Sequence, residues 1–577
     1  MRAYYFLFII NFLIGEILFT DITSSAGISF SGMSEGVCVF DYNNDGLDDI
    51  LFTTRGGGTI HLYKNNGEMN FSNVSIESNI GQEMESRTAV AGDYDNDGDL
   101  DLFIGATIGS SKFFRNNGDG SFQDITILTG IDIGDQVRGC SWFDYNQDGH
   151  LDLYVGLLYE PNLLYKNNGD GTFIDIAQNV GATGPVGAGI IMGLGAIDYD
   201  RDGDQDLYIT QDNYNGNILL KNENGSFFTD VSYSSQTDLE VMGMGIAFGD
   251  INKDGFFDFY TTNLNENSLL LNSSDGVFSD ISPASGTQDI IGSMGWGTFF
   301  FDANNDGWVD IYNNNETAFG GVYNSLMINQ RDLTFDVLGP SCGAIINNNG
   351  YGSAFSDLDH DGDLDIILVG HSSTVGSINL LRNDSDNRNW IMFELQQNQN
   401  NIFAIGSTVE LFTANDMQFN FVAAGNSYCS QNTLDIHFGL DTINFIDSVK
   451  VIWPDNHEEV FYNIDVNSKN ILLRGNGSIM GQLNYTNPVT NNFVLKSVYP
   501  NPFNAETTIS IQAHANIKPY IQIFDLKGKL LKEKVYKLEG SENHQIRLSL
   551  GTFSTGIYFL RVQSSQYAVT TKLQLLK

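Results

Sequence analysis

The sequence is poor in cysteine and in long apolar runs. Its 577 residues include only four cysteines, too few for the disulfide framework that stabilises small secreted domains. We expect Cys38, Cys140, Cys342 and Cys429 to be buried free thiols. Beyond the N-terminus, no stretch reaches the roughly 20 apolar residues that crossing a bilayer requires. No transmembrane span is therefore predicted.

Basic residues are also scarce. Lys and Arg number 28 against 71 Asp and Glu, which gives a net charge of −43. A charge of this sign and size argues against nucleic acid or an anionic membrane as a partner. The imbalance is uneven, because from residue 496 onward basic residues outnumber acidic ones by 11 to 5. The change in composition marks a domain boundary near 490.

Signatures of common catalytic sites are missing. The sequence has no nucleophile elbow, phosphate-binding loop or zinc motif, and its eight histidines do not recur at a fixed phase. A catalytic site needs a nucleophile and a base, or two carboxylates in different environments. Many of the carboxylates here belong instead to a repeated loop that is described below. The sequence thus favours a non-catalytic protein.

Residues 1–18 are predicted to be a signal peptide. Met1 and Arg2 precede an apolar run over residues 3–14, which matches the short charged start and apolar core of a secretory signal. Cleavage is placed loosely before Phe19. We therefore expect the protein to be secreted or held at the outer cell surface.

A nine-residue motif, Asp-x-Asp/Asn-x-Asp-Gly-x-x-Asp, recurs seven times. Its copies begin at residues 41, 93, 144, 198, 250, 302 and 357, which are 51 to 55 residues apart. Self-similarity at such a period is the mark of a repeat architecture. A glycine stands five residues before six of the copies, and Thr88 takes this place in the second repeat.

Each repeat contains four short strand patterns. Apolar runs flank the loop, a third run ends in a turn such as Asn65-Asn66-Gly67, and a fourth begins with a pattern such as Phe122-Gln-Asp124. Four short strands in about 50 residues are typical of a propeller blade. The fourth pattern also occurs at Phe19-Thr-Asp21, before the first loop, and it is missing after Asn383. The sequence predicts an all-β, seven-bladed β-propeller whose N-terminal strand completes blade seven and removes the open edge.

The repeated loops are predicted to bind calcium. Side-chain oxygens at positions 1, 3, 5 and 9 and the backbone carbonyl oxygen of position 7 suit a cation that takes about six to eight oxygen ligands, and the set lacks the Cys and His that zinc or copper prefer. About seven Ca²⁺ ions, mainly structural, are expected. The predicted ligands are Asp41, Asn43, Asp45, Leu47 and Asp49; Asp93, Asp95, Asp97, Asp99 and Asp101; Asp144, Asn146, Asp148, His150 and Asp152; Asp198, Asp200, Asp202, Asp204 and Asp206; Asp250, Asn252, Asp254, Phe256 and Asp258; Asp302, Asn304, Asp306, Trp308 and Asp310; and Asp357, Asp359, Asp361, Asp363 and Asp365.

These loops make residues 19–385 resemble the FG-GAP or VCBS repeats that are related to the integrin α-subunit propeller. The resemblance rests on the Asp-x-Asp-x-Asp-Gly-x-x-Asp motif in every repeat. It implies that the loops join the first two strands of each blade on one face of the propeller and that ligands bind the opposite face.

Two further segments resemble known families. Residues 386–475 are similar to the ASPIC/UnbV domain, on the motifs at 389–390, 404–406, 425–431, 437–440 and 447–455, and their alternating runs read as the strands of a small β domain. After a linker at 476–493, residues 494–577 resemble a type A sorting domain of the type IX secretion system, on the motifs at 499–504, 523–528 and 556–559. This resemblance implies a β-sandwich that engages the type IX secretion machinery. One more β-sandwich binding module is the alternative.

The face opposite the calcium loops is the predicted binding face for a protein or glycan ligand. The connections that lead into the inner strands vary on this face and contribute Met, Arg and aromatic side chains. These side chains either bind a partner or pack around the propeller axis. We therefore expect a secreted, non-catalytic binding or adhesion module. The alternatives are a secreted polysaccharide-active enzyme and a structural surface-layer component. The candidate ligand-face residues are Arg87, Arg138, Met192, Met242, Met294, Trp296 and Tyr351.

Overall fold

The computed structural model describes most of the chain after the predicted signal peptide. Residues 1–16 and most of the predicted linker, 476–478 and 484–492, lie outside the described residues. The described residues are 17–29, 32–134, 136–184, 189–288, 293–316, 323–372, 375–385, 388–414, 416–475, 479–483, 493–501, 503–513, 518–524, 529–538, 543–564 and 567–576.

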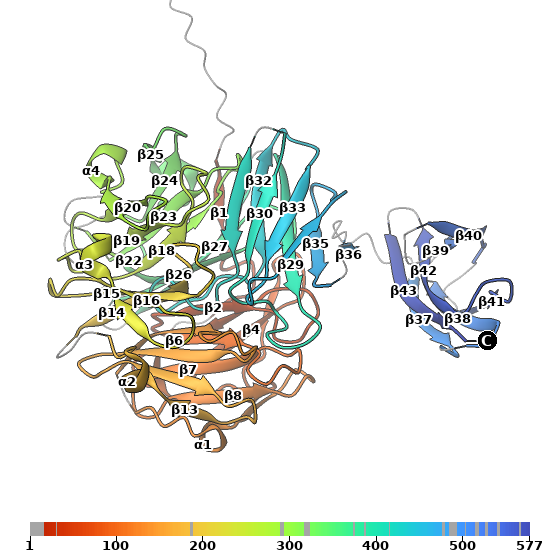
Figure 1. Cartoon of the computed structure of the whole chain (residues 1–577), viewed down its shortest axis with the longest axis horizontal. Helices are drawn as coiled ribbons and strands as arrows, with labels where there is room; N and C mark the ends of the chain where they lie inside the picture. The colour runs from red at the N-terminus through yellow and green to blue at the C-terminus, as the bar shows by residue number, and fades with distance from the viewer. Residues whose placement is uncertain are drawn as a thin grey trace, which may run out of the picture. The chain divides into compact units, whose positions relative to one another are not determined.

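The first two-thirds of the chain form seven four-stranded antiparallel sheets, one for each repeat (Figure 1). Blades 1 to 3 contain β2 (Val37–Phe40), β3 (Asp49–Phe52), β4 (His61–Asn65) and β5 (Phe71–Asn73); β6 (Glu85–Gly92), β7 (Asp101–Ile108), β8 (Lys112–Asn116) and β9 (Phe122–Asp124); and β10 (Val137–Phe143), β11 (Asp152–Leu157), β12 (Leu163–Asn167) and β13 (Phe173–Asp175).

Blades 4 to 7 repeat this order. Their strands are β14 (Ile191–Ile197), β15 (Asp206–Gln211), β16 (Ile218–Asn222) and β17 (Phe228–Asp230); β18 (Ile246–Gly249), β19 (Asp258–Thr261), β20 (Ser268–Asn272) and β21 (Phe278–Asp280); β22 (Met294–Phe301), β23 (Asp310–Glu316), β24 (Ser325–Asn329) and β25 (Phe335–Val337); and β26 (Gly350–Ser356), β27 (Asp365–His371), β28 (Gly376–Asn383) and β1 (Phe19–Asp21).

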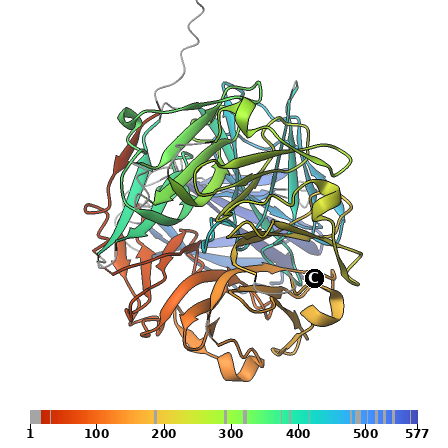
Figure 2. The same ribbon diagram turned by 90° about the vertical axis from the view of Figure 1, so that its left-hand side faces the viewer.

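The N-terminal strand closes the ring. In blade 7, β1 pairs antiparallel with β28, with Phe19 opposite Asn383 and Asp21 opposite Leu381. Figure 2 shows β1, in red, beside the blue-green strands of the last blade. The hydrogen bonds of this pair occupy an edge that would otherwise be open. The predicted all-β propeller fold and its closing strand are confirmed.

Short helical turns follow the last strand of several blades. They are α1 (Thr126–Thr129), α2 (Ala177–Val180), α3 (Ser232–Ser235) and α4 (Ser282–Ser285), with a 3-10 turn, η2 (Pro340–Cys342), after blade 6. After α1, the left-handed Gly130 ends the turn, a conformation that glycine adopts without steric cost. These turns are too short to interrupt the strand pattern.

Two more four-stranded sheets follow the propeller and pack on it, at the right of the propeller in Figure 1. Their orders are β32-β29-β35-β36 and β31-β30-β33-β34, and β29 and β35 run parallel. One buried cluster joins apolar residues of these sheets to those of blades 2 and 3. The strands are β29 (Asn389–Gln396), β30 (Thr408–Phe412), β31 (Met417–Phe421), β32 (Ile436–Asp441), β33 (Ser448–Ile452), β34 (Glu458–Phe461), β35 (Lys469–Leu473) and β36 (Ile479–Leu483).

Contacts divide the chain into two compact units, residues 1–480 and 481–577. The second unit has a three-stranded sheet, β37-β38-β41, and a four-stranded sheet, β40-β39-β42-β43, around its own apolar core. Its strands are β37 (Phe493–Tyr499), β38 (Glu506–Ala513), β39 (Tyr520–Phe524), β40 (Leu530–Val535), β41 (Asn543–Ser549), β42 (Gly556–Ser564) and β43 (Tyr567–Leu575).

The four cysteines are free and buried, as predicted from their number and spacing. Within the described part of the chain, none of the helices has the length and apolar character needed to span a membrane.

Candidate metal centres and the axial channel

Each repeated loop joins the first strand of its blade to the second. In blade 2 the loop starts at Asp93, directly after β6, and its ninth residue, Asp101, opens β7. The Asp93 carboxylate accepts hydrogen bonds from the backbone N–H groups of Asp97 (3.1 Å) and Gly98 (3.0 Å). Gly98 has a φ of +92°, which a residue with a Cβ adopts only with strain. This geometry explains why position 6 is glycine.

The ninth residue anchors the loop to the blade. Asp101 is fully buried, and its two carboxylate oxygens accept hydrogen bonds from the backbone N–H groups of Asn116 (2.8 Å) and Tyr94 (3.2 Å). The same two contacts recur at the ninth position of all seven loops. The last aspartate of each motif therefore has a structural role whether or not a cation is bound.

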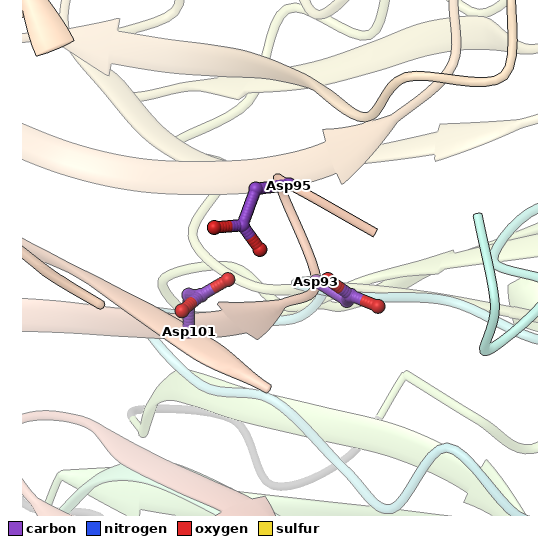
Figure 3. A group of neighbouring side chains, drawn as sticks. All are labelled: Asp93, Asp95 and Asp101. Atoms are coloured by element: carbon purple, nitrogen blue, oxygen red, sulfur yellow. The ribbon is translucent and has the colours of Figure 1, made fainter. Parts of the chain in front are cut away.

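Three loops bring carboxylate oxygens of three aspartates within 4.8 Å of one another. They are the groups Asp93, Asp95 and Asp101, shown in Figure 3; Asp198, Asp200 and Asp206; and Asp357, Asp359 and Asp361. One oxygen of Asp198, one of Asp200 and one of Asp359 are buried with no hydrogen-bond partner. Unpaired buried carboxylate oxygens are costly.

Burial also perturbs the pKa values of these acids. It raises the pKa of Asp93 to about 7, with repulsion from Asp97 and Asp95 adding to the shift. The pKa of Asp198 is raised to about 7 by burial and by Asp202 and Asp200. For Asp101, burial raises the pKa well above its ordinary value. Clustered carboxylates in such an environment favour a bound cation, which removes both the desolvation cost and the repulsion.

The donor set fits a hard divalent cation. The side chains at positions 1, 3, 5 and 9 supply only oxygen, the ligand type that calcium and magnesium take. Position 7, predicted to contribute its carbonyl oxygen, is held by a hydrogen bond from its backbone N–H to the position-5 carboxylate. This bond is present in all seven loops, at Leu47, Asp99, His150, Asp204, Phe256, Trp308 and Asp363.

Basic side chains reach several of the loops. Lys64 lies 2.8 Å from Asp45 in blade 1, and Lys166 lies 3.1 Å from Asp148 in blade 3. In blade 4, Lys221 pairs with Asp200 and lies 2.8 Å from Asp202. Arg331 of blade 6 lies 3.0 Å from Asp306. Without a cation, these groups offset part of the negative charge of the loops.

Position 4 links five of the seven loops to the loop of the next blade, a role that the sequence analysis missed. All seven residues at this position have a left-handed φ between 55° and 60°. The side chains of Asn44, Asn96, Gln147, Arg201 and Asn305 each donate to the backbone carbonyl of the position-6 glycine in the next blade, at 2.7 to 3.3 Å. The signal was present in the sequence, because position 4 always carries a polar side chain long enough to donate: Asn, Asn, Gln, Arg, Lys, Asn and His.

The sheets β29 to β35 dock on the loop face of the propeller. Arg201 and Lys253, at position 4 of blades 4 and 5, form ion pairs with Glu410 and Asp416. On blade 7, the His437 side chain lies 3.0 Å from the carbonyl oxygen of Gly362. The predicted metal centres thus lie under a second domain that contacts their loops directly.

Residues 422–433, which we call the axial loop, leave these sheets and run along the inner strands of the propeller. Gln431 exchanges backbone hydrogen bonds with Val37 and Val39 of blade 1. Ala424 accepts a hydrogen bond from Trp142 of blade 3. Other contacts reach blades 2, 6 and 7, through Ala91, Thr298 and Phe355. Because it contacts inner strands from around the ring, the axial loop occupies the channel of the propeller.

The glycine that precedes the repeated motif permits this close packing. A Cβ on Gly36 would lie 2.2 Å from the carbonyl oxygen of Arg87 in the next blade and 2.3 Å from that of Cys429 in the axial loop. Such distances leave no room for a side chain. The recurring glycine therefore lets the inner strands and the axial loop approach one another.

The predicted ligand-face residues surround the tip of the axial loop. Tyr428, at this tip, is fully buried. Its ring centroid lies 4.7 Å from that of Trp296, and its hydroxyl accepts a hydrogen bond from Arg87 at 2.7 Å. Met192, Met294, Trp296, Tyr351 and Arg87 are buried, whereas Met242 and Arg138 are partly exposed. Most of these side chains therefore pack against the axial loop.

Comparison with protein families supports a three-part chain. The model "FG-GAP-like repeat" matches residues 41–104, 93–155, 157–209, 198–261 and 251–312. The model "ASPIC and UnbV" matches residues 397–478, and "Secretion system C-terminal sorting domain" matches residues 497–575. The chain carries these three elements, as its motifs predicted, and the sorting domain identifies a secreted or cell-surface protein.

Curated relatives are distant. Cartilage acidic protein 1 of Homo sapiens is 24% identical over 454 residues, which cover 74% of this chain and 60% of that protein. The Mus musculus protein of the same name is 24% identical over 485 residues, covering 76% and 74%. The Xenopus tropicalis protein is 27% identical over 199 residues, covering 32% and 30%. The chain thus spans less than two-thirds of the length of the human and Xenopus relatives.

Several solved structures show limited similarity. An Agrocybe aegerita lectin, described by its recognition of terminal N-acetylglucosamine, has a TM-score of 0.37 and 19% identity, over 54% of this chain and 84% of that one. Sqt1 of Saccharomyces cerevisiae has a TM-score of 0.38 and 9% identity, covering 64% and 99%. The Dos1 propeller has a TM-score of 0.35 and 10% identity, covering 75% and 98%. The assignment of blades here rests on the strand pairing.

Proposed function

We propose that this secreted or cell-surface β-propeller of FG-GAP-like repeats is a non-catalytic binding or adhesion module that calcium makes rigid. About seven Ca²⁺ ions bind the repeated loops, mainly to stabilise the fold. A protein or glycan ligand binds the face opposite these loops. The type IX secretion machinery recognises the C-terminal unit.

The observation that carries this proposal is the set of buried, unpaired carboxylate oxygens at Asp198, Asp200 and Asp359. The loops that hold them are joined to neighbouring loops through position 4, and the second domain packs on several of them. A cation in one loop therefore stabilises contacts that extend to the next blade and to the second domain. Binding to the folded state alone raises stability by mass action.

Calcium removal tests the metal role. The melting temperature of the full-length protein should fall by many degrees when EDTA replaces calcium, and added calcium should restore it, whereas magnesium should restore it less. Equilibrium dialysis should count about seven bound calcium ions per chain. A melting curve that is identical with EDTA and with calcium would disprove the calcium proposal.

The ligand role is tested separately. The full-length, calcium-loaded protein should bind a defined subset of a glycan and matrix-protein array, and calcium removal should weaken this binding. Binding to nothing on such arrays would favour a structural surface-layer component.

A secreted polysaccharide-active enzyme is the alternative that requires two accessible carboxylates and a base away from the calcium loops. At the end of the channel opposite the calcium loops, Glu35 lies 3.1 Å from His371, and Glu316 accepts hydrogen bonds from Trp296 and Tyr351. Glu35, however, is fully buried and paired with Arg87 and Arg55. Such a carboxylate has no route to a substrate, so the geometry supports the binding module better.

A further inference from the structure

The end of the channel opposite the calcium loops holds a cluster of charged side chains in a strongly acidic protein. Glu35 and Arg55 come from blade 1, Arg87 from blade 2, Arg138 from blade 3 and His371 from blade 7. Except for Arg55, each residue lies at or beside one end of the first or second strand of its blade. This is the strand end that is farther from the metal loop. Two carboxylates, Glu35 and Glu316, thus lie at the same end of the channel as three guanidinium groups, although the chain as a whole carries a net charge of −43.

Glu35 forms ion pairs with several of these groups. Its Oε2 lies 2.5 Å from Arg87 Nε, and its Oε1 pairs with Arg55 and lies 3.1 Å from His371 Nε2. Burial raises the pKa of Glu35, but Arg87, His371 and Arg55 together hold it at about 2. Arg87 also donates to the Tyr428 hydroxyl. Glu35 therefore already pairs with Arg87, Arg55 and His371.

Arg138 has no such partner. Among the described residues it forms no ion pair, and its Nε and Nη1 atoms are buried without a hydrogen-bond partner. Burial, with repulsion from Arg87, lowers its pKa, but a guanidinium remains charged in a protein. A buried charge without a counter-charge costs several kcal/mol. The residue as a whole is nevertheless partly exposed, so part of the side chain reaches solvent although these two nitrogens do not.

We propose that Arg138 binds an oxyanion at this end of the channel, either a free anion or the acidic group of a larger ligand. This inference rests on the proposed binding role of the face opposite the calcium loops and specifies the ligand chemistry there. A guanidinium presents its donors in a planar fork that matches a carboxylate, sulfate or phosphate group. The bound anion supplies the counter-charge that Glu35 cannot give to a third arginine.

Equilibrium dialysis with radiolabelled sulfate tests the site. The full-length, calcium-loaded protein is compared with Arg138→Met and with Arg547→Met, which removes the same charge from an exposed side chain of the second unit. Chloride keeps the ionic strength constant. We expect one saturable sulfate site, weakened about tenfold or more by Arg138→Met, because the variant lacks the charged hydrogen-bond donors. Arg547→Met should bind sulfate normally. Absence of saturable binding, or equal binding by both variants, would overturn the proposal.

Competition identifies the anion that the site prefers. Unlabelled phosphate, acetate and galacturonate are titrated against bound sulfate. Displacement by galacturonate at lower concentration than by acetate indicates the acidic group of a sugar, whereas stronger displacement by phosphate indicates a free or phosphate-bearing ligand. Displacement by chloride alone at the same concentrations contradicts an oxyanion site.

Thermal melting distinguishes a binding residue from a merely structural one. In chloride buffer, Arg138→Met should melt at the wild-type temperature or higher, because it removes an unpaired buried charge. Added sulfate should raise the melting temperature of the wild type and leave that of the variant unchanged. A lower melting temperature of the variant in chloride buffer would make Arg138 structural.

The two proposals can fail independently. Sulfate binding at Arg138 with no ligand on the arrays would refute the wider binding role and keep the oxyanion site. An array ligand whose binding is the same for wild type and Arg138→Met, with no sulfate binding, would refute only the oxyanion site.

Discussion

The side-chain amide of Asn116 in blade 2 donates a 2.8 Å hydrogen bond to the backbone carbonyl oxygen of Tyr42 in blade 1, 74 residues earlier. The equivalent asparagine of every blade makes the same contact with the loop of the preceding blade, and Asn65 of blade 1 completes the circle at Leu358 of blade 7. Seven buried amides therefore join seven blades into a closed ring.

Replacing Asn116 with Ala should destabilise the propeller. The change leaves the buried carbonyl oxygen of Tyr42 without its donor and also removes the bond from Asn116 to Leu100, which should lower the free energy of unfolding by about 1–3 kcal/mol. Asn117→Ala is the matched control, because the Asn117 side chain is exposed and donates a hydrogen bond to the hydroxyl of Ser121 in the same turn; we expect a change within about 0.5 kcal/mol. Chemical denaturation followed by circular dichroism measures both. Equal effects would mean that the amide contact between blades contributes nothing.

Lys221 should compete with calcium for the loop of blade 4. It pairs with Asp200 and Asp202, so Lys221→Met should destabilise the calcium-free protein and leave the calcium-loaded protein as stable as the wild type or more so. The gap between the melting temperatures in calcium and in EDTA should widen. Lys112→Met, which breaks an ion pair with Asp124 away from the metal loops, should leave the gap unchanged. A gap that narrows in Lys221→Met would show that the lysine assists calcium binding.

His437 should make the docking of the second domain sensitive to acid. Burial lowers its pKa to about 4, opposed in part by its contact with the Gly362 carbonyl. A histidine titrates near 6.5 when unfolded, so the folded state resists protonation. The resulting stability is complete above about pH 6.5 and is lost as the pH falls through about 4. It amounts to at most about 3 kcal/mol for a shift of this size.

His437→Gln tests this pH dependence. Glutamine keeps an N–H donor for Gly362 but does not titrate, so the melting temperature of the variant should fall less than that of the wild type between pH 7 and pH 4.5. His457→Gln, at an exposed position, is the control and should follow the wild type. Parallel curves for all three proteins would assign the acid sensitivity to other groups.

Tyr428 should hold the axial loop in the channel. Tyr428→Phe keeps the buried ring and leaves Arg87 Nη1 without its acceptor, so we expect a loss of about 1–3 kcal/mol. Tyr428→Ala removes the ring from the cluster with Trp296 and Tyr351, and about 3–5 kcal/mol should be lost. Thermal melting ranks the stabilities of the wild type and the two variants, and tryptophan fluorescence should report a change around Trp296 in the Ala variant. An Ala variant as stable as the wild type would show that the channel does not need the loop.

Much of the fold could be read from the sequence because it repeats. The phase of the motif gave the number of blades, and the stray Phe19-Thr-Asp21 pattern gave the closing strand that pairs with β28. The turn pattern at Asn116-Asn117-Gly118 was read as a hairpin turn, which is only half of its role. The amide of Asn116 points to another blade, and turn chemistry alone does not reveal a contact 74 residues away.

Other relations depended on contacts between residues far apart in the chain. The segment Gly425 to Gln431 was recognised as a family motif, but its sequence has no periodicity that would place it in the propeller channel. The residues at the inner-strand starts, Arg87 and Trp296 among them, were interpreted either as a binding face or as packing around the axis, and the structure buries these two against Tyr428. Whether these side chains are exposed or buried depends on the axial loop, which lies more than 130 residues further along the chain.

The sequence alone determined the repeated scaffold, because its loops, strands and turns are local patterns whose chemistry is fixed by residues a few positions apart. Which end of the channel is filled, which arginine lacks a counter-charge and which loops support the second domain were decided only by the tertiary structure. These properties depend on distances between side chains from different blades and on which of them exclude water, and no single repeat carries that information.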